Sequence, residues 1–338
     1  LLYKARAHAR ALYNRTGSGR DTRSMSHPRR FRFGAELSGP LAGMSWAETV
    51  RRVADLGYST VFLPDHFQDQ YGPIAAMASA AAYDDRVNVG SLVFDNDYRH
   101  PVTLAMEMAT IDQISGGRLE LGVGAGWKRL DYDQAGIEMG TPKVRVERMM
   151  ESVLILKSLF AGGAVDFEGE HYRLSGVVGT PPHTPGGPPL LIAGGSKRML
   201  RFAGQHAAIV GVNPSIHSGT IDAESAQDAL ADRMDQKVEW VKEGAGDRFA
   251  DLEINAWTAV AAITDDALGF AEIIAPGFGM SPEDAHQALE SPQVLVGTVE
   301  ELTERLHHRR ERWGFSYHVV ANDAVLEMAP LVEAVTGT

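Results

Sequence analysis

The chain of 338 residues is long enough for two or three domains of ordinary size, or for one large barrel. It is 44% hydrophobic and 22% charged, as globular proteins are, and its lack of cysteine excludes disulfides, thiolate metal sites and a cysteine nucleophile. The net charge of −12 and the lack of a long uninterrupted apolar run argue against nucleic acid or a membrane as the main partner. We therefore expect a cytoplasmic protein that acts on a small molecule.

The first 30 residues differ from the rest of the chain in their charge. They contain eight Lys or Arg residues against one acid, Asp21, whereas residues 31–338 carry a net charge of −19. The chain opens with Leu-Leu, and Met25 is followed by Ser-His-Pro in the manner of a true start. We expect residues 1–30 to be a basic leader that is disordered or not native, with an Arg-rich targeting arm as the alternative. Residues 31–338 are then the folded domain.

Short β-rich runs alternate with helical runs from residue 31 onward. Their near-continuous hydrophobicity is typical of parallel strands that are covered on both faces. The predicted strands are residues 31–36, 60–64, 87–94, 118–123, 189–193, 207–212, 252–263 and 316–320.

Helix starts are marked between these strands. Residues 45–48 and 298–301 carry the Ser/Thr-x-x-Glu pattern of a capping box, and Thr141 before Pro142 supplies an N-cap and an N1 proline. Eight strands, each followed by a helical segment, predict an α/β protein with a single (β/α)8 TIM barrel. Insertions are expected near 162–188 and 265–292. The alternative is a doubly wound parallel sheet with a second domain.

A carboxylate and an imidazole follow the second predicted strand. In a (β/α)8 barrel the active site forms at the carboxyl ends of the strands, so the residues just after each strand matter most. Asp65 and His66 stand there, and an imidazole can give or take a proton near neutral pH. We take both as candidate catalytic residues. The alternative is that His66 only caps the strand end by hydrogen bonding.

Two glycine-rich runs follow the fourth and fifth predicted strands. Glycine lets backbone N–H groups approach an anion closely, which suits residues 122–126. The alternative for that run is close packing of a helix against a strand. Residues 194–196, Gly-Gly-Ser, open a helix, whose N-terminus is a favourable phosphate site. The histidines are scattered along the chain, so no metal site is expected.

Several motifs occur in one order: residues 65–67 (Asp-His-Phe), 99–101 (Arg-His-Pro), 115–118 (Ser-Gly-Gly-Arg), 119–127 (Leu-Glu-Leu-Gly-Val-Gly-Ala-Gly-Trp) and 193–195 (Ala-Gly-Gly). This set resembles the bacterial luciferase-like superfamily and, within it, the oxidoreductases that depend on coenzyme F420, a deazaflavin. The resemblance covers about residues 31–320, and its motifs are more specific for the superfamily than for the cofactor. It implies a barrel that binds F420 and moves a hydride between C5 of the deazaflavin and a small organic substrate.

The resemblance also implies roles for individual residues. Asp65 and His66 match an acid–imidazole pair beside the deazaflavin, where the His is assigned proton transfer. The bond from Ser91 to Leu92 falls where relatives place a non-prolyl cis peptide against the ring. The implied cofactor-binding residues are Ser91, Leu92, Phe94, Gly124, Ala125, Gly126, Ala193, Gly194, Gly195 and Ser196.

One position departs from the family pattern. Glucose-6-phosphate dehydrogenases of this family have a glutamate where this chain has Trp127, so we do not expect a sugar oxidation that needs this acid. Phe67, Tyr98 and Trp127 predict a substrate pocket lined by aromatic rings instead. The alternatives are a luciferase-like monooxygenase that uses reduced FMN, and a non-catalytic flavin-binding barrel. Relatives are often homodimers, and the helix with Met149 and Met150 is the candidate partner face.

Overall fold

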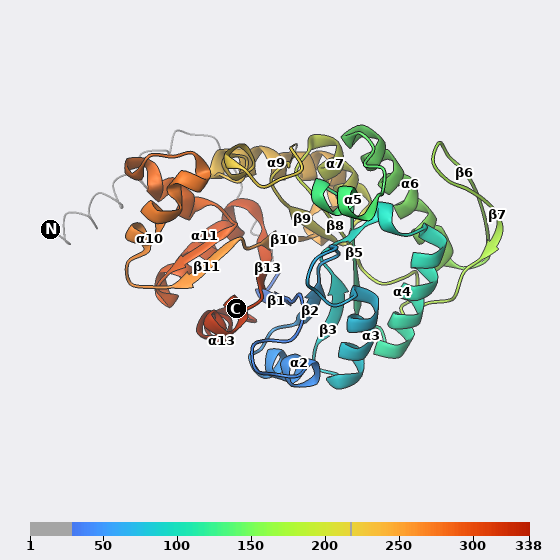
Figure 1. Ribbon diagram of the computed structural model, residues 1–338, viewed down its shortest axis with the longest axis horizontal. Helices are drawn as coiled ribbons and strands as arrows, with labels where there is room; N and C mark the ends of the chain where they lie inside the picture. Colours follow the sequence, from blue (N-terminus) through green and yellow to red (C-terminus); the bar gives the residue numbers. More distant parts are fainter. Residues whose placement is uncertain (1–28, 217) are drawn as a thin grey trace.

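The computed structural model describes residues 29–216 and 218–338, so the expectation for residues 1–28 lies outside the described residues. Eight parallel strands pair in the order β1-β2-β3-β5-β8-β9-β10-β13, and β13 pairs with β1 to close a barrel (Figure 1). Closure confirms the (β/α)8 prediction and excludes the open doubly wound sheet. The strands are β1 (Arg32–Glu36), β2 (Thr60–Leu63), β3 (Asn88–Ser91), β5 (Leu119–Gly124), β8 (Leu190–Gly194), β9 (Ile209–Val212), β10 (Glu253–Trp257) and β13 (Phe315–Ala321).

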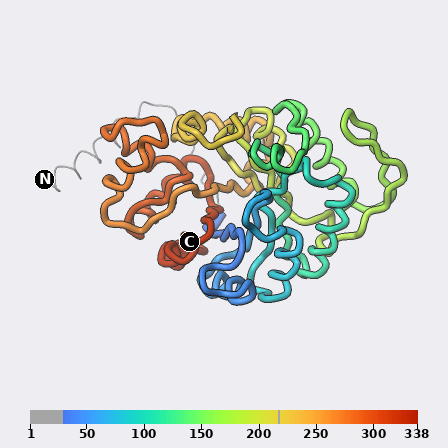
Figure 2. The backbone as a smooth tube through the Cα atoms, viewed as in Figure 1, coloured from blue at the N-terminus to red at the C-terminus, as the bar shows by residue number. Residues whose placement is uncertain are grey.

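Helices surround this barrel, as the tube in Figure 2 shows. In the described residues, four short 3-10 helices lie among them, at Asn96–Tyr98, Gly246–Asp251, Ala275–Phe278 and Pro282–Glu290. The α-helices are α2 (Trp46–Asp55), α3 (Pro73–Tyr83), α4 (Pro101–Ser115), α5 (Arg129–Ala135), α6 (Pro142–Ala161), α7 (Lys197–His206), α8 (Ala223–Gln227), α9 (Ala231–Ala245), α10 (Ala267–Ile274), α11 (Val299–Trp313), α12 (Ala324–Glu327) and α13 (Ala329–Val335).

The three predicted helix starts are confirmed. Reciprocal capping boxes begin α2 at Ser45 and α11 at Thr298, and the Thr141 hydroxyl accepts a hydrogen bond from Val144 N at the start of α6. Each cap satisfies backbone N–H groups that the helix itself leaves unpaired. Local sequence therefore determines where these helices begin.

Two predicted strands are each divided in the structure. Residues 87–94 form β3 and the short β4 (Phe94–Asp95), separated by a cis peptide bond between Leu92 and Val93. The expected cis bond, from Ser91 to Leu92, is therefore wrong by one residue, because counting back from the next helix does not resolve a single position. Residues 252–263 form β10 and β11 (Val260–Ile263), and β11 leaves the barrel to pair with β12 (Val294–Gly297).

The two insertions form separate small structures. Residues 162–188 contain the antiparallel hairpin of β6 (Ala164–Glu168) and β7 (Arg173–Val178), which projects beside α4 and α6 in Figure 1. Residues 265–292 are helical, with α10 followed by the 3-10 segments, and Ser281 is the N-cap of the last one. They cover a small apolar cluster around Phe278, Val294 and Val296, next to the β11–β12 pair.

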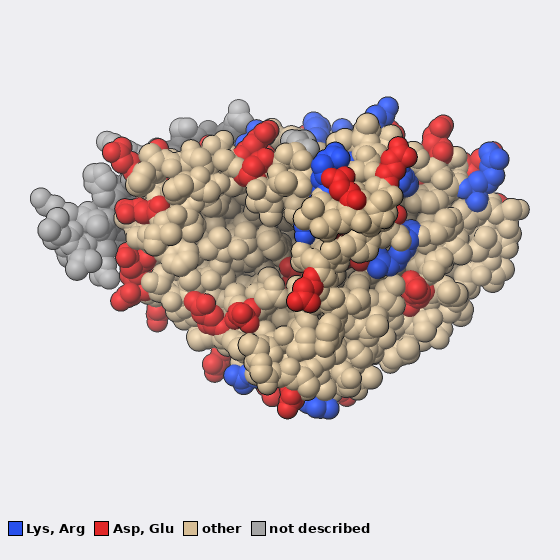
Figure 3. All heavy atoms as spheres, viewed as in Figure 1, with Lys and Arg blue, Asp and Glu red and all other residues tan. Residues whose placement is uncertain are grey.

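Acidic side chains are concentrated at one end of the molecule. Figure 3 shows Asp and Glu side chains gathered along the end of the molecule formed by α10 and the segments around it. Within the described part of the chain, no helix has the length and apolar character needed to cross a membrane. Met149 of α6 is fully buried in the chain's own core and Met150 is partly buried against it, so Met149 itself offers no surface to a partner, and the helix as a partner face stays a prediction.

The amino end of the barrel interior is polar and charged. The Arg32 guanidinium of β1 donates to both carboxylate oxygens of Glu253 (2.8 and 2.5 Å) and to Glu120 Oε1 (2.6 Å). The Tyr317 hydroxyl donates to the other oxygen of Glu120 (2.9 Å), and Asn88 Nδ2 donates to Oε1 (2.9 Å). This network joins five of the eight strands.

We expect Arg32→Met to lower the free energy of unfolding by about 3–5 kcal/mol, because it leaves two buried carboxylates without their cation. Arg173→Met is the matched control: Arg173 pairs with Glu168, both side chains are 77% exposed, and such pairs contribute about 0–1 kcal/mol. Urea unfolding of both variants measures the difference. Equal losses for the two variants would show that the interior network does not stabilise the barrel.

Candidate active site

His66 lies at the carboxyl end of the barrel, in the loop after β2. Its Nδ1 is 2.6 Å from Asp131 Oδ2 of α5, and the Asp131 side chain is only 1% exposed. Because a carboxylate oxygen only accepts, Nδ1 donates this hydrogen bond and Nε2 remains available. The imidazole meets the Trp127 ring edge-on, with centroids 5.7 Å apart. The buried acid therefore fixes the orientation of a half-exposed imidazole.

Asp65 does not face His66, contrary to the predicted acid–imidazole pair. Both Asp65 oxygens accept hydrogen bonds from Arg99, at 2.5 and 3.0 Å, and the backbone N–H of Asp95 donates to Oδ2 (3.0 Å). Neighbouring residues in an extended loop point to opposite sides, so adjacency in sequence does not bring these two side chains together. The acid that contacts the imidazole is Asp131.

A second buried carboxylate lies near this pair. The Tyr132 hydroxyl bonds to both oxygens of Asp95 (3.0 and 2.9 Å), and burial raises the pKa of Asp95 to about 7. Gly126, with φ of +75°, packs directly against both groups, and a Cβ there would overlap the Tyr132 hydroxyl and the Asp95 carboxylate. A side chain at this position is therefore excluded by space as well as by backbone conformation.

Glu36 is a third acid that sequence reasoning did not select. It ends β1, is 8% exposed, and its Oε2 accepts a hydrogen bond of 2.5 Å from Trp257 Nε1 at the end of β10. Burial raises the pKa of Glu36 to about 7. A carboxylate at the carboxyl end of a predicted barrel strand was the available signal, because a buried titratable group at that end suggests function.

The aromatic residues predicted for the substrate pocket are brought together. The rings of Phe67 and Tyr98 stack with centroids 4.5 Å apart, and Tyr98 lies 5.6 Å from Tyr132. Trp127 contacts His66 as described above. Trp127 covers one side of the imidazole, which stays 22% exposed, and Phe67 is itself 43% exposed.

The residues around the cis peptide are mostly inaccessible. Ser91 is fully buried, and its hydroxyl bonds to Gly122 O (2.8 Å). Phe94 is also fully buried, in the core between barrel and helices, so neither side chain reaches the barrel mouth. Leu92 is partly buried against the barrel interior. Any contact of Ser91 or Phe94 with a cofactor would therefore be through the backbone, and the assignment of Ser91, Leu92 and Phe94 as cofactor-binding residues stays a prediction.

The first glycine run serves close packing. A Cβ at Gly122 would overlap Ser91 O, and one at Gly124 would come 2.7 Å from Val93 Cγ2. Ala125 is partly buried and packs against the core. The glycines in the strand part of this run therefore serve close packing, which was the alternative to anion binding. Residues 124–126 lie where the run reaches the carboxyl end of the barrel.

The second glycine run begins α7 across the barrel. The Ser196 hydroxyl accepts a hydrogen bond from Met199 N (3.4 Å), and Ala193 is part of the interior apolar cluster. Lys197 and Arg198 pair with the carboxylates of Glu243 and Glu147, on the surface. The donors that this loop itself offers are therefore backbone N–H groups at the start of α7, apart from Met199 N, which is already bonded to the Ser196 hydroxyl.

The backbone carbonyl of Gly195 accepts a hydrogen bond from a buried lysine. Lys237 Nζ of α9 donates to Gly195 O and to Asp228 Oδ2, both at 2.7 Å, and Asp228 Oδ2 also accepts from Ser215 N (2.8 Å). A Cβ at Gly195 would lie 2.5 Å from the Pro214 and Ser215 backbone. Position 195 therefore has no room for a side chain, and any substitution of Gly195 would displace this backbone.

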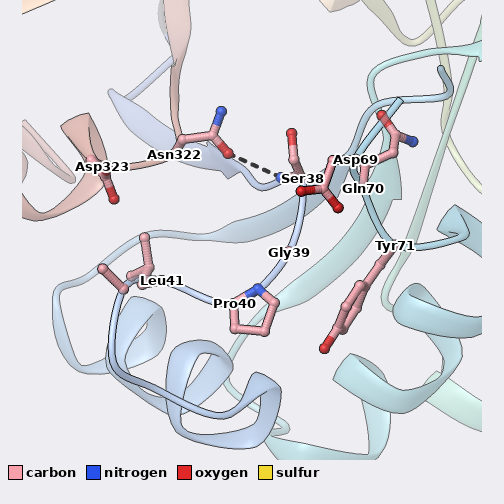
Figure 4. A pocket seen from close by; sticks show the side chains of 10 residues that line it. Ser38, Gly39, Pro40, Leu41, Asp69, Gln70, Tyr71, Asn322 and Asp323 are labelled. Atoms are coloured by element: carbon pink, nitrogen blue, oxygen red, sulfur yellow. Dashed lines mark hydrogen bonds between the residues drawn. The ribbon is translucent and has the colours of Figure 1, made fainter. Parts of the chain in front are cut away.

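A cavity of about 390 Å³ opens on the same end of the barrel. Its walls come from the loop after β1, the loop after β2 and the end of β13 (Figure 4). Across residues 29–216 and 218–338, no cluster of three or more His, Asp or Glu side chains is arranged to hold a metal ion. The lining residues are Ser38, Gly39, Pro40, Leu41, Ala42, Asp69, Gln70, Tyr71, Asn322 and Asp323.

We expect Glu36→Gln and Asp95→Asn each to gain stability relative to wild type as the pH rises from 5 to 8. Both carboxyls have folded-state pKa values near 7, above their ordinary values, so the stability they contribute is present at low pH and lost as the pH rises through 7. The difference in unfolding free energy should change by up to about 1.4 kcal/mol per pH unit below pH 7.

The quantity to compare is the free energy of unfolding of each variant minus that of the wild type. Burial lowers the pKa of His318 to about 3, so His318 makes the stability of every variant rise with pH, and this contribution cancels in the difference. Urea unfolding at four pH values measures it, with the exposed Asp265→Asn as the control. A difference that stays constant from pH 5 to 8 in both variants would contradict the raised pKa values.

A family model described as luciferase-like monooxygenase matches residues 30–266. An F420-dependent glucose-6-phosphate dehydrogenase of Nocardia farcinica is 32% identical over 161 residues, which are 44% of this chain and 47% of that protein. The chain thus spans about half the length of the curated relatives it matches.

Solved structures share the fold at lower sequence identity. The coenzyme F420-dependent tetrahydromethanopterin reductase of Methanopyrus kandleri has a TM-score of 0.68 and 19% identity, over 90% of this chain and 99% of that chain. The monooxygenase RslO1 of Streptomyces bottropensis has a TM-score of 0.66 and 20% identity, over 89% and 96%. The barrel is therefore shared by proteins whose names describe different chemistries.

Proposed function

The chain belongs to the luciferase-like monooxygenase family, and on that premise we propose that it is an F420-dependent oxidoreductase. It moves a hydride between C5 of the deazaflavin and a small organic substrate. The observation that carries the proposal is the His66–Asp131 pair, a proton-exchanging imidazole held by a buried acid at the carboxyl end of the barrel. The similarity to the F420-dependent dehydrogenase of Nocardia farcinica supports this cofactor.

The loops of the described chain fit an anionic cofactor. The first turn of α7 presents backbone N–H groups, and the helix dipole favours an anion there by about 0.3–1 kcal/mol. Residues 194–196 would hold the cofactor's phosphate, with residues 124–126 bordering the same channel. When bound, the deazaflavin supplies the carbon that gains or loses the hydride.

His66 exchanges the proton that accompanies the hydride. Asp131 holds Nδ1, so Nε2 is the atom that gives or takes this proton. Trp127 packs against one side of the imidazole. Phe67 and Tyr98 stack on each other and would line the substrate pocket. The Glu36 carboxyl, whose pKa burial raises to about 7, is a second group that can exchange a proton at this end of the barrel.

The runner-up is a monooxygenase that uses reduced FMN and oxygen. The family description and the similarity to RslO1 favour it, because the same barrel and helix N-terminus suit the FMN phosphate. A non-catalytic flavin-binding barrel is the third candidate, and it would not need an oriented imidazole.

We expect F420 to bind the chain and FMN to compete weakly. Equilibrium titration that follows F420 fluorescence measures both affinities with one protein preparation. Tight binding of FMN together with no binding of F420 would replace the proposal by the monooxygenase.

We expect His66→Ala to lower turnover at least tenfold with little change in cofactor affinity, because general acid–base catalysis contributes about 10²–10⁴-fold. Asp131→Asn should also lower turnover and change its pH profile, since the amide holds the imidazole differently. Asp133→Asn is the control, an exposed acid on the same helix. Turnover by His66→Ala equal to that of wild type would remove His66 from the mechanism.

A further inference from the structure

Hydrogen bonds of backbone N–H groups connect the walls of the cavity beside the carboxyl end of β1. Ser38 N donates to Asn322 Oδ1 (3.0 Å), and Tyr71 N donates to Ser38 O (2.7 Å). Asn322 N also donates to the carbonyl of Glu36 (2.8 Å). Three segments that are distant in sequence are thus joined around one space, as Figure 4 shows for Ser38 and Asn322. The cavity is preformed, which is typical of small-molecule sites.

Its position suits a substrate of the proposed reaction. Asp69 is three residues after His66 in one loop, so their Cα atoms are at most about 11 Å apart. The β1 strand beside the cavity and the β8 strand before the Gly194–Ser196 loop are four strands apart in either direction around the barrel. The cavity and the proposed phosphate site therefore lie on opposite sides of the mouth.

The lining is rich in hydrogen-bond acceptors and contains no Lys or Arg. Asp69 from the β2 loop and Asp323 after β13 bring two carboxylates, with Pro40 and Leu41 as an apolar wall. A cation does bond to the β2 loop, because Lys128 Nζ donates to Gln68 Oε1 (2.6 Å) and lies 3.7 Å from Asp131. Lys128 is not among the lining residues. The lining attracts donors and repels anions.

We propose that this cavity binds the polar end of the substrate, and that the substrate presents hydroxyl or ammonium donors and no phosphate or carboxylate group. This inference rests on the proposed function in taking the ligand as the substrate. A substrate without a phosphate group would distinguish this chain from a dehydrogenase that acts on sugar phosphates. Asp69 and Asp323 are then the residues that determine specificity, by accepting from donors and by excluding anions.

The test compares three probes that share one sugar ring and differ in charge: glucosamine, glucose and glucose 6-phosphate. Saturation-transfer NMR at low salt, without cofactor, measures their affinities for the wild type and for Asp69→Asn/Asp323→Asn. We expect glucosamine to bind at least fivefold more tightly than glucose 6-phosphate, with glucose between them. The ratio should fall to within twofold in the double variant and should decrease in 0.5 M salt.

Asp247→Asn is the matched control, because Asp247 lies in the segment before β10, at the other end of the barrel, and should leave the ratio unchanged. Glucose 6-phosphate binding as tightly as glucosamine, or a ratio unchanged in the double variant, overturns the proposal. Charge selectivity in a protein that does not bind F420 would support the cavity and overturn the F420 proposal. Circular dichroism confirms that the double variant is folded.

Discussion

The Arg32 guanidinium inside the amino end of the barrel is the interaction on which the rest of the structure depends. It bonds to Glu253 of β10 and Glu120 of β5, which are strands on other sides of the barrel. Burying three charges is costly, and the cost is offset only when their geometry is correct. Since a shift of one residue in a strand turns every side chain to the opposite face, the network accepts only one register.

That register determines what reaches the other end of the barrel. Side chains two residues apart on a strand share a face, so Arg32, Gly34 and Glu36 of β1 all point inward. Gly34 packs against Phe62 and Val319 in the barrel interior. The same strand therefore places a cation in the floor and a protonable acid at the mouth. The chemistry of the mouth follows from pairing at the opposite end.

The sequence predicted the elements well where the signals are local. Hydrophobic runs located all eight barrel strands, and the caps at Ser45, Thr141 and Thr298 located three helix starts. The division of residues 252–263 was missed, because nothing in the sequence of β11 shows that its partner is β12 rather than the barrel. Pairing between distant strands is a tertiary property.

The candidate site was predicted less completely. His66 and the rings of Phe67, Tyr98 and Trp127 were selected, and the structure brings them together. Asp131 was missed because its role depends on how α5 folds back toward the β2 loop, which sequence spacing does not reveal.

The roles of the two glycine-rich runs were ambiguous in the sequence for a related reason. Glycine can leave an amide open to an anion, which is the role proposed for the start of α7, and it can also admit a neighbouring backbone, as at Gly122 beside Ser91 O. Only the packing partners distinguish these two uses, and those partners come from other strands.

The orientation of His66 can be measured directly by long-range proton–nitrogen NMR of protein with ¹⁵N-labelled histidine, assigned with His66→Ala. Above the pH at which the imidazole is charged, we expect Nδ1 of His66 to carry the proton and Nε2 to be unprotonated, because Asp131 accepts from Nδ1. In Asp131→Asn this preference should weaken. A proton on Nε2 in the wild type would contradict the proposed pairing and with it the assignment of Nε2 as the proton-exchanging atom.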